Sequence, residues 1–71
     1  MHKYEISIFW SEDDGVFLAE VPALPGCMAH GDSQESALTN CQAAIGLWID
    51  TARDLGRTIP KPDARRVRVV R

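Results

Sequence analysis

The sequence predicts a two-layer α+β sandwich in which one long helix covers one face of a small, mostly antiparallel sheet. Three patterns predict it. Apolar and polar residues alternate on both sides of a turn within residues 3–21, apolar residues recur at steps of three and four between Ser33 and Gly56, and residues 66–70 alternate again. Alternation indicates half-buried strands, and steps of three and four indicate an amphipathic helix. A sheet and a helix that are each apolar on one side are stable when those sides pack together.

Residues 3–10 and 16–21 predict a hairpin. The Asp14-Gly15 pair between them favours a tight turn, because glycine accepts the positive φ that such turns require. Alternate residues of each strand are expected to face the helix: Tyr4, Ile6, Ile8 and Trp10 in the first strand, and Phe17, Ala19 and Val21 in the second.

The hairpin is followed by a proline-rich connection. Pro22 ends the second strand, because proline cannot donate a hydrogen bond to a sheet. Residues 24–26 (Leu-Pro-Gly) form a tight, stiff connection, and residues 27–30 predict a short third strand.

The long helix is expected to begin after Asp32 or Ser33, because either side chain can accept a hydrogen bond from a backbone N–H of the first turn. Asp32 with Glu35 approximates a capping box. Gly56 is placed to end the helix in the left-handed conformation. We expect Trp48 in the core. The apolar stripe of the helix consists of Ala37, Leu38, Cys41, Ala44, Ile45, Trp48, Ile49, Ala52 and Leu55.

Strand directions follow from the short connections. If the first strand runs up, the second runs down and the third up, and the helix then returns the chain to the starting end. The last strand, residues 66–70, therefore runs up beside the first, with Val67 and Val69 facing the helix. This predicts a β-β-β-α-β chain with the sheet order 3-2-1-4.

Length and composition describe one small globular domain, residues 1–71. Of its 71 residues 45% are apolar and 25% charged, and the net charge is −2. This mildly acidic charge argues against direct binding to nucleic acid, since such affinity comes mostly from basic residues. Cys27 and Cys41 are expected to be reduced and buried in a cytoplasmic protein. We expect no membrane span, no metal and no cofactor.

A core of this size barely offsets the conformational entropy lost on folding, so self-association or partner binding is expected to stabilise the chain. The candidate surface is the sheet face turned away from the helix. It carries four apolar side chains, Phe9, Val16, Leu18 and Met28. Contiguous exposed apolar patches usually mark an interface with another copy or another protein. The alternative is a bulge that turns some of these side chains inward.

Two further features adjoin this face. Glu12, Asp13 and Asp14 concentrate negative charge at the hairpin tip, where a basic partner could dock. A solvated turn is the alternative, and we favour it. Trp10 lies at a strand end, where it could anchor a partner, although a place in the core or at its edge is the favoured interpretation.

The following segments carry a resemblance to a known family: Val16-Phe17-Leu18-Ala19-Glu20-Val21, Pro22-Ala23-Leu24-Pro25-Gly26-Cys27 and Ala29-His30-Gly31-Asp32-Ser33. Together they resemble the HicB antitoxins, whose pattern runs P-x-L-P-G-C and then G-D-[ST]. The likeness continues through the helix to Gly56, Ile59 and Pro60. The resemblance implies a reduced ribonuclease-H-like core and assembly into dimers or tetramers. It also implies a partner, a small basic HicA-type toxin that cleaves mRNA and that the antitoxin binds and occludes.

The sequence departs from this family pattern at two points. Ser36 replaces the usual glutamate three residues after Ser33, which is expected to weaken the capping box. The chain also ends at Arg71, which leaves no room for the ribbon-helix-helix or helix-turn-helix domain that many HicB antitoxins carry. We therefore expect the toxin-binding portion alone, and operator binding is in doubt.

Two other functions stay open. A freestanding homo-oligomer with a regulatory or ligand-binding role would share the fold and the apolar face. A ribonuclease-H-like nuclease would need converging carboxylates to hold two metal ions. The available carboxylates are spread over different elements: Glu5, Glu20, Asp32 and Asp63. His30 has no nucleophile or metal beside it, so we expect no catalytic residues. The C-terminal arginines are expected to protect an edge strand: Arg65, Arg66, Arg68 and Arg71.

Overall fold

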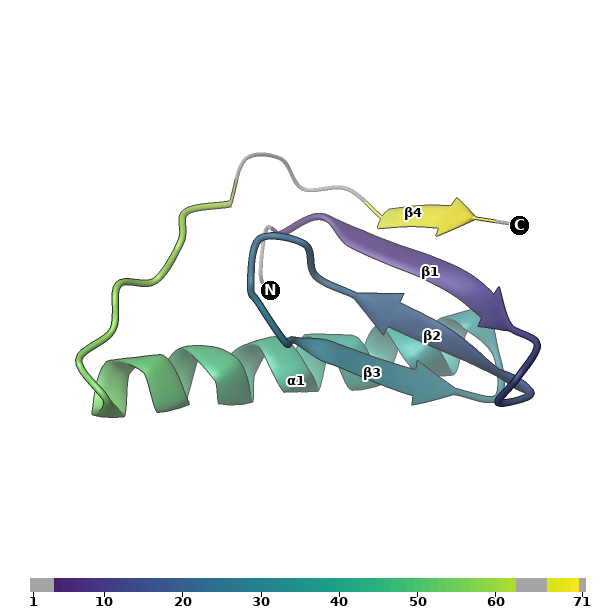
Figure 1. The fold of residues 1–71 in the computed structure, drawn as a ribbon, viewed down its shortest axis with the longest axis horizontal. Helices are drawn as coiled ribbons and strands as arrows, with labels where there is room; N and C mark the ends of the chain where they lie inside the picture. The colour runs from purple at the N-terminus through teal and green to yellow at the C-terminus, as the bar shows by residue number, and fades with distance from the viewer. Residues whose placement is uncertain (1–3, 63–66, 71) are drawn as a thin grey trace.

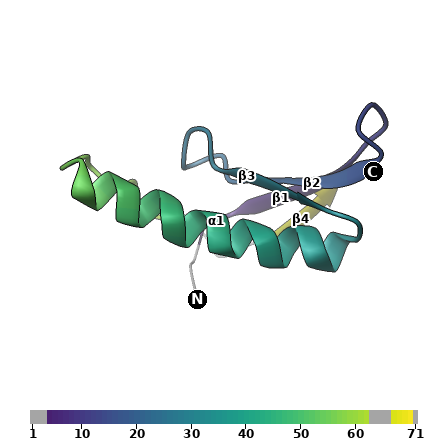
Figure 2. The same cartoon turned by 90° about the horizontal axis from the view of Figure 1, so that it is seen from below.

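A computed structural model describes residues 4–62 and 67–70 of the chain. The elements follow in the order β1 (Ile6–Ser11), β2 (Val16–Glu20), β3 (Met28–Gly31), α1 (Gln34–Asp54) and β4 (Val67–Val70). In Figures 1 and 2, α1 runs along one face of the sheet, and no other described element covers the opposite face. The predicted α+β architecture, one helix on a mostly antiparallel sheet, is confirmed.

The strands are arranged in the order β3-β2-β1-β4. β1 and β2 pair antiparallel with Phe9 opposite Leu18, and β2 and β3 pair antiparallel with Leu18 opposite His30. β4 is parallel to β1, with Ile8 opposite Val69. The helix returns the chain to the end of the sheet where β1 begins, which is why β4 runs in the same direction as β1.

The core lies between α1 and the inner face of the sheet. Its buried apolar residues are Tyr4, Ile6, Ile8, Ala19, Val21, Leu24, Cys27, Ala37, Cys41, Ile45 and Ala52. Trp10 lies opposite Phe17, on the side of the sheet that its alternation predicts, but 44% of its surface is exposed. Phe17 packs against the core, and the Trp10 ring contacts Phe17 edge to face with centroids 5.0 Å apart. Trp10 therefore lies at the margin of the core.

The connection between β2 and β3 is closed by backbone hydrogen bonds. The Leu24 N–H donates to the Val21 carbonyl (3.0 Å), the Cys27 N–H donates to the Leu24 carbonyl (2.9 Å), and the Val21 N–H donates to the Cys27 carbonyl (3.0 Å). Leu24 is completely buried, and Gly26 has a φ of 79°. The loop thus inserts Leu24 into the core, and its left-handed turn favours glycine at position 26.

The helix begins at a complete capping box built from two serines. The Ser36 N–H donates to the Ser33 Oγ and the Ser33 N–H donates to the Ser36 Oγ, each at 3.0 Å. The N-cap is thus Ser33, so the box expected from Asp32 and Glu35 is not the one that forms. Ser36 completes the box although it replaces glutamate. Gly56, with a φ of 69°, follows the end of the helix as predicted.

Ser33→Ala is expected to lower the free energy of unfolding by about 1 kcal/mol, because the N–H of Ser36 loses its acceptor. Urea denaturation followed by circular dichroism measures the change. Gln34→Ala is the matched control, since this exposed residue lies one position further along the helix and outside the box. Equal stabilities for the two variants would contradict the assigned cap.

Candidate functional site

The sheet face opposite α1 carries the predicted apolar residues in a regular register. Phe9, Leu18 and His30 form one row across β1, β2 and β3, and Glu20 and Met28 lie opposite each other in the next row. The pairing of β1 with β2 continues without a bulge from one end to the other. The alternative of a register error therefore does not apply to these strands.

Exposure on this face differs between its centre and its edge. Phe9, Val16 and Leu18 are half-buried, whereas Met28, on the edge strand β3, is 49% exposed. No described element lies over the patch (Figure 2), so the partial burial comes from neighbouring side chains of the sheet. The result is an apolar surface that is centred on Leu18 and only partly exposed, and that another protein could cover.

The hairpin tip adds exposed negative charge to one end of the sheet. Asp14 belongs to the turn: its Oδ2 accepts from the Ser11 Oγ (3.1 Å), and its N–H donates to the same Oγ (3.3 Å). Gly15 has a φ of 65°, as an Asp-Gly turn requires. Glu12 and Asp13 are exposed beside it. Turn chemistry accounts for Asp14 and Gly15, while Glu12 and Asp13 present their charge to solvent.

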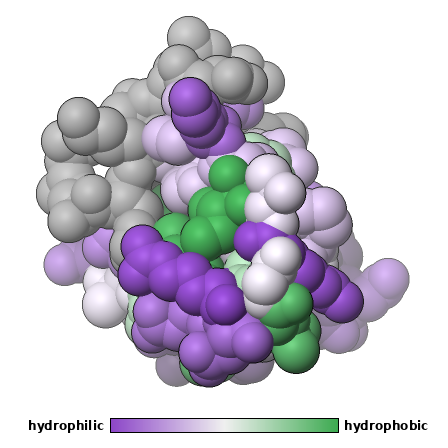
Figure 3. All heavy atoms as spheres, turned by 90° about the vertical axis from the view of Figure 1, so that its left-hand side faces the viewer, coloured by the Kyte–Doolittle hydropathy of each residue, from purple (hydrophilic) through white to green (hydrophobic). Residues whose placement is uncertain are grey.

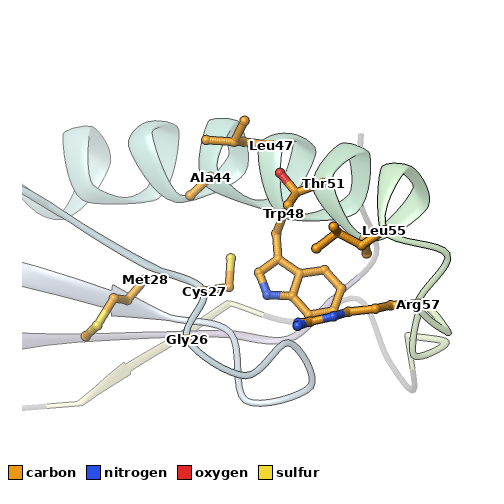
Figure 4. A pocket seen from close by; sticks show the side chains of 10 residues that line it. Gly26, Cys27, Met28, Ala44, Leu47, Trp48, Thr51, Leu55 and Arg57 are labelled. Atoms are coloured by element: carbon orange, nitrogen blue, oxygen red, sulfur yellow. The ribbon is translucent and has the colours of Figure 1, made fainter.

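A second apolar surface, which we call the α1 groove, lies between the C-terminal half of α1 and the start of β3. It has a volume of about 320 Å³ (Figure 4). Its lining consists of Gly26, Cys27, Met28, Ala44, Leu47, Trp48, Thr51, Ala52, Leu55 and Arg57. Figure 3, which views the molecule from the end where α1 finishes, shows apolar residues gathered among hydrophilic ones.

Trp48 forms part of the wall of the α1 groove. It is half-buried, packs against the core and donates from its Nε1 to the Pro25 carbonyl (2.9 Å). Trp48 therefore joins α1 to the loop before β3, and it belongs to the core as predicted, at its edge. Leu55 departs from the predicted stripe, because it is 62% exposed. Leu47, which lies outside the predicted stripe, is 69% exposed.

Cys27 and Cys41 are free and buried, in agreement with the sequence analysis. Burial raises the pKa of the Cys41 thiol from its ordinary value of 9.0 to about 11, and the charge of Cys27 adds to this rise. Burial also raises the pKa of Cys27. Since the thiolate is the reactive form, both thiols are poor nucleophiles near neutral pH.

Thiol labelling is expected to be slow in the folded chain at about pH 8 and fast in urea, because unfolding removes the burial that disfavours the thiolate. The raised pKa of Cys41 stabilises the folded state below pH 9.0, and this contribution is lost as the pH rises from 9.0 towards about 11. The urea midpoint should fall through that range, and the fall should be smaller in Cys41→Ala. Equal labelling rates with and without urea would contradict the buried thiols.

The carboxylates considered for a nuclease are placed as follows. Glu20 and Asp32 are exposed and Glu5 is half-buried. Within residues 4–62 and 67–70, the structure has no group of three or more His, Cys, Asp or Glu side chains positioned to hold a metal ion. Outside the described residues lie Asp63, Arg65, Arg66 and Arg71. The helix that the structure describes is not apolar enough to cross a membrane.

Comparison with known proteins agrees with the motifs noted in the sequence. A family model described as "HicB_like antitoxin of bacterial toxin-antitoxin system" matches residues 4–68. The chain is 34% identical over 67 residues to "UPF0150 protein Ta0767" of Thermoplasma acidophilum. The aligned residues cover 94% of this chain and 96% of the relative. It is 36% identical over 62 residues to "UPF0150 protein ssl0259" of Synechocystis. The aligned residues cover 87% of this chain and 84% of the relative. No solved structure matches the chain significantly.

The family match covers β1, β2, β3 and α1, ends within β4, and includes the motif residues whose structural roles are described above. Leu24 fills the core, Gly26 makes the left-handed turn, and Ser33 caps α1. The resemblance noted in the sequence is thereby confirmed. This chain belongs to the HicB-like antitoxin family of bacterial toxin–antitoxin systems.

Proposed function

We propose that this chain is an antitoxin that binds and occludes a small, basic, mRNA-cleaving toxin of the HicA type. The observation that carries the proposal is the family match over residues 4–68. Inhibition is stoichiometric and needs no catalytic residue, because a protein that covers the toxin's active site denies RNA access to it. We place this activity in the cytoplasm, where mRNA is translated and where Cys27 and Cys41 stay reduced.

The sheet face opposite α1 is the toxin-binding surface in this proposal. Phe9 and Leu18 give it an apolar centre, and Glu20 and His30 are exposed polar residues around that centre. An apolar centre with a polar rim is the usual anatomy of a protein interface. Val16 and Met28 extend the same surface on β2 and β3. The order β3-β2-β1-β4 is also compatible with a reduced ribonuclease-H-like core, which we keep as part of the proposal.

The hairpin tip favours a basic partner. Glu12, Asp13 and Asp14 are exposed, and Trp10 is 44% exposed at the same end of β1. Exposed acidic residues accelerate association with a basic protein, and an exposed tryptophan can anchor an interface. We therefore extend the toxin-binding surface from the sheet face around the end of β1, to the hairpin tip and to Trp10, whose ring lies beside Phe17 on the helix side of the sheet. Asp14 keeps its role in the turn as well.

Co-expression in bacteria tests this proposal. The small basic protein encoded by the neighbouring reading frame is expressed alone, with this chain, or with an unrelated protein of similar size. We expect growth arrest when the basic protein is expressed alone or with the unrelated protein. With this chain, growth is expected to recover and the two proteins should purify together. Growth arrest that persists in the presence of folded chain would contradict the proposal.

A further inference from the structure

The α1 groove combines an apolar lining with a charged side chain at one end. Of its ten described lining residues, Arg57 alone carries a charge, and most of the others are apolar. The volume of about 320 Å³ lies at the lower end of the range for small-molecule sites, about 300–1,000 Å³. Such sites are mostly apolar and contain a few polar groups that orient the ligand. The groove therefore has the size and the composition of a small-molecule site.

The turn that ends α1 fixes the backbone of Arg57 beside the groove. The Gly56 N–H donates to the Arg53 carbonyl (3.1 Å), and the Arg57 N–H donates to the Ala52 carbonyl (2.8 Å). With the left-handed Gly56, these bonds form a Schellman motif, in which the residue after the glycine frequently packs an apolar side chain against the helix. Here that residue is an arginine, so a guanidinium group lies where an apolar side chain is usual (Figure 4).

The guanidinium group of Arg57 is available to a ligand. The side chain is exposed, and no residue within 4–62 or 67–70 forms a salt bridge or a hydrogen bond with it. In Figure 4 it extends towards the indole of Trp48, which the hydrogen bond to the Pro25 carbonyl (2.9 Å) holds in the groove wall. A guanidinium group can bind a carboxylate through two parallel N–H···O bonds. Arg57 is therefore suited to hold an anionic head group beside an apolar wall.

The apolar lining continues along α1 away from this charged end. Leu55, Thr51 and Leu47 follow one another along the helix, and the two leucines are about 12 Å apart along its axis. Leu55 is 62% exposed and Leu47 69%, so an extended aliphatic tail could cover both. We propose that the α1 groove binds a medium-chain fatty carboxylate, with its tail along the leucines and its head group on Arg57.

The charges near the groove favour a carboxylate over a phosphate as the head group. Arg57 supplies one positive charge. Asp50, Arg53 and Asp54 are exposed on the same half of α1 outside the lining, and together they carry two negative charges and one positive. Their net negative charge repels a doubly charged phosphate monoester more strongly than a singly charged carboxylate, because the repulsion grows with the charge of the ligand.

The α1 groove is separate from the surface that we propose for the toxin. The groove lies at the C-terminal half of α1, whereas Leu18 is the centre of the opposite sheet face and the hairpin tip lies at the other end of the molecule (Figures 1 and 2). Met28, on the edge strand β3, borders both surfaces. A carboxylate in the α1 groove therefore goes beyond the antitoxin function and does not depend on it.

A fluorescence titration with decanoate tests this site, because Trp48 lies in the groove wall and Trp10 lies beside Phe17, outside the lining. In Trp10→Phe, whose remaining indole is Trp48, we expect a saturable change in emission with a Kd below about 1 mM. In Trp48→Phe, the emission of Trp10 should not change. The affinity should rise by up to about fourfold for each methylene added between hexanoate and decanoate, since each methylene covers more of the apolar lining.

Two arginine variants of the Trp10→Phe chain test the head group. Arg57→Gln should weaken decanoate binding about threefold, as expected for the loss of an exposed ion pair, and should remove the preference for octanoate over octanol. Arg53→Gln is the matched control, because it removes an exposed positive charge of α1 outside the lining. We expect it to keep the affinity of the Trp10→Phe chain. Circular dichroism checks that both variants are folded.

Each arm of the experiment can contradict the proposal. No saturable change in Trp48 emission up to about 1 mM decanoate overturns it. Equal changes in the emission of Trp10 and Trp48 also overturn it, because they indicate unspecific association with the tail. Equal affinities of the Arg57→Gln and Arg53→Gln chains overturn the role of Arg57, and tighter binding of octyl phosphate than of octanoate overturns the carboxylate. Decanoate binding by a chain that fails to inhibit the toxin supports this site and contradicts the proposed function alone.

Discussion

Leu18→Lys is expected to weaken the complex with the toxin by at least about 2 kcal/mol, which corresponds to a roughly 30-fold higher Kd. Leu18 lies at the centre of the row that joins β1, β2 and β3, between Phe9 and His30. A lysine at this position would place a positive charge in the apolar centre of the interface and against a basic protein. The charge would lose water without gaining an acceptor, and this loss is costly.

Isothermal titration calorimetry of the purified chain with toxin measures the effect. Leu47→Lys is the matched control, because it makes the same change at an exposed leucine on the opposite side of the molecule. We expect this control to keep the wild-type affinity for the toxin when the variant and the wild-type chain are compared at the same oligomeric state. An affinity that falls equally in both variants, or in neither, would contradict the assignment of the sheet face.

Gly31→Ala is expected to lower the free energy of unfolding by about 2–3 kcal/mol, which is a large change for a domain of 71 residues. A Cβ at position 31 would meet the backbone nitrogen of Ala37 at 2.5 Å and the side-chain oxygen of Ser36. Backbone atoms cannot move aside without displacing α1 from β3. The effect comes from this close approach and not from φ, which is positive at other glycines of the chain and not at this one.

Urea denaturation at one fixed protein concentration measures this prediction, because a dimer would make the apparent stability depend on concentration. His30→Ala is the matched control, since it shortens an exposed side chain at the neighbouring position of β3. The unfolding midpoint of His30→Ala should stay close to that of the wild type. A Gly31→Ala chain as stable as this control would show that the helix does not pack as closely on β3 as described.

The elements of the fold were predictable because each follows from local chemistry. The Asp14-Gly15 turn, the Ser33 cap and the left-handed Gly56 all act within a few residues of where they stand. Alternation also assigned Ile8 and Ala19 correctly to the core. Alternation predicts which face of the sheet a side chain lies on, but it does not predict how much of that face the helix covers. Trp10 therefore lies on the predicted face and still has an exposed ring.

The α1 groove could not be predicted from periodicity, because its walls come from residues 26–28 and 44–57, which are far apart in the sequence. A signal for it was present in Leu47 and Thr51, which lie beside the predicted stripe and lead at steps of four to Leu55, the last residue of that stripe. The family motif did not help here, since Leu24 and Ser33 serve the core and the helix cap. Such motif residues identify the fold more directly than they identify the surface that meets a partner.

An RNA-cleavage titration tests the antitoxin assignment most directly. Purified toxin is incubated with a messenger RNA, and this chain is added in increasing molar ratio while the rate of cleavage is followed. The rate should fall in proportion to the added chain and reach the level of the toxin-free reaction when the toxin is saturated. Undiminished cleavage in the presence of excess folded chain would contradict the account.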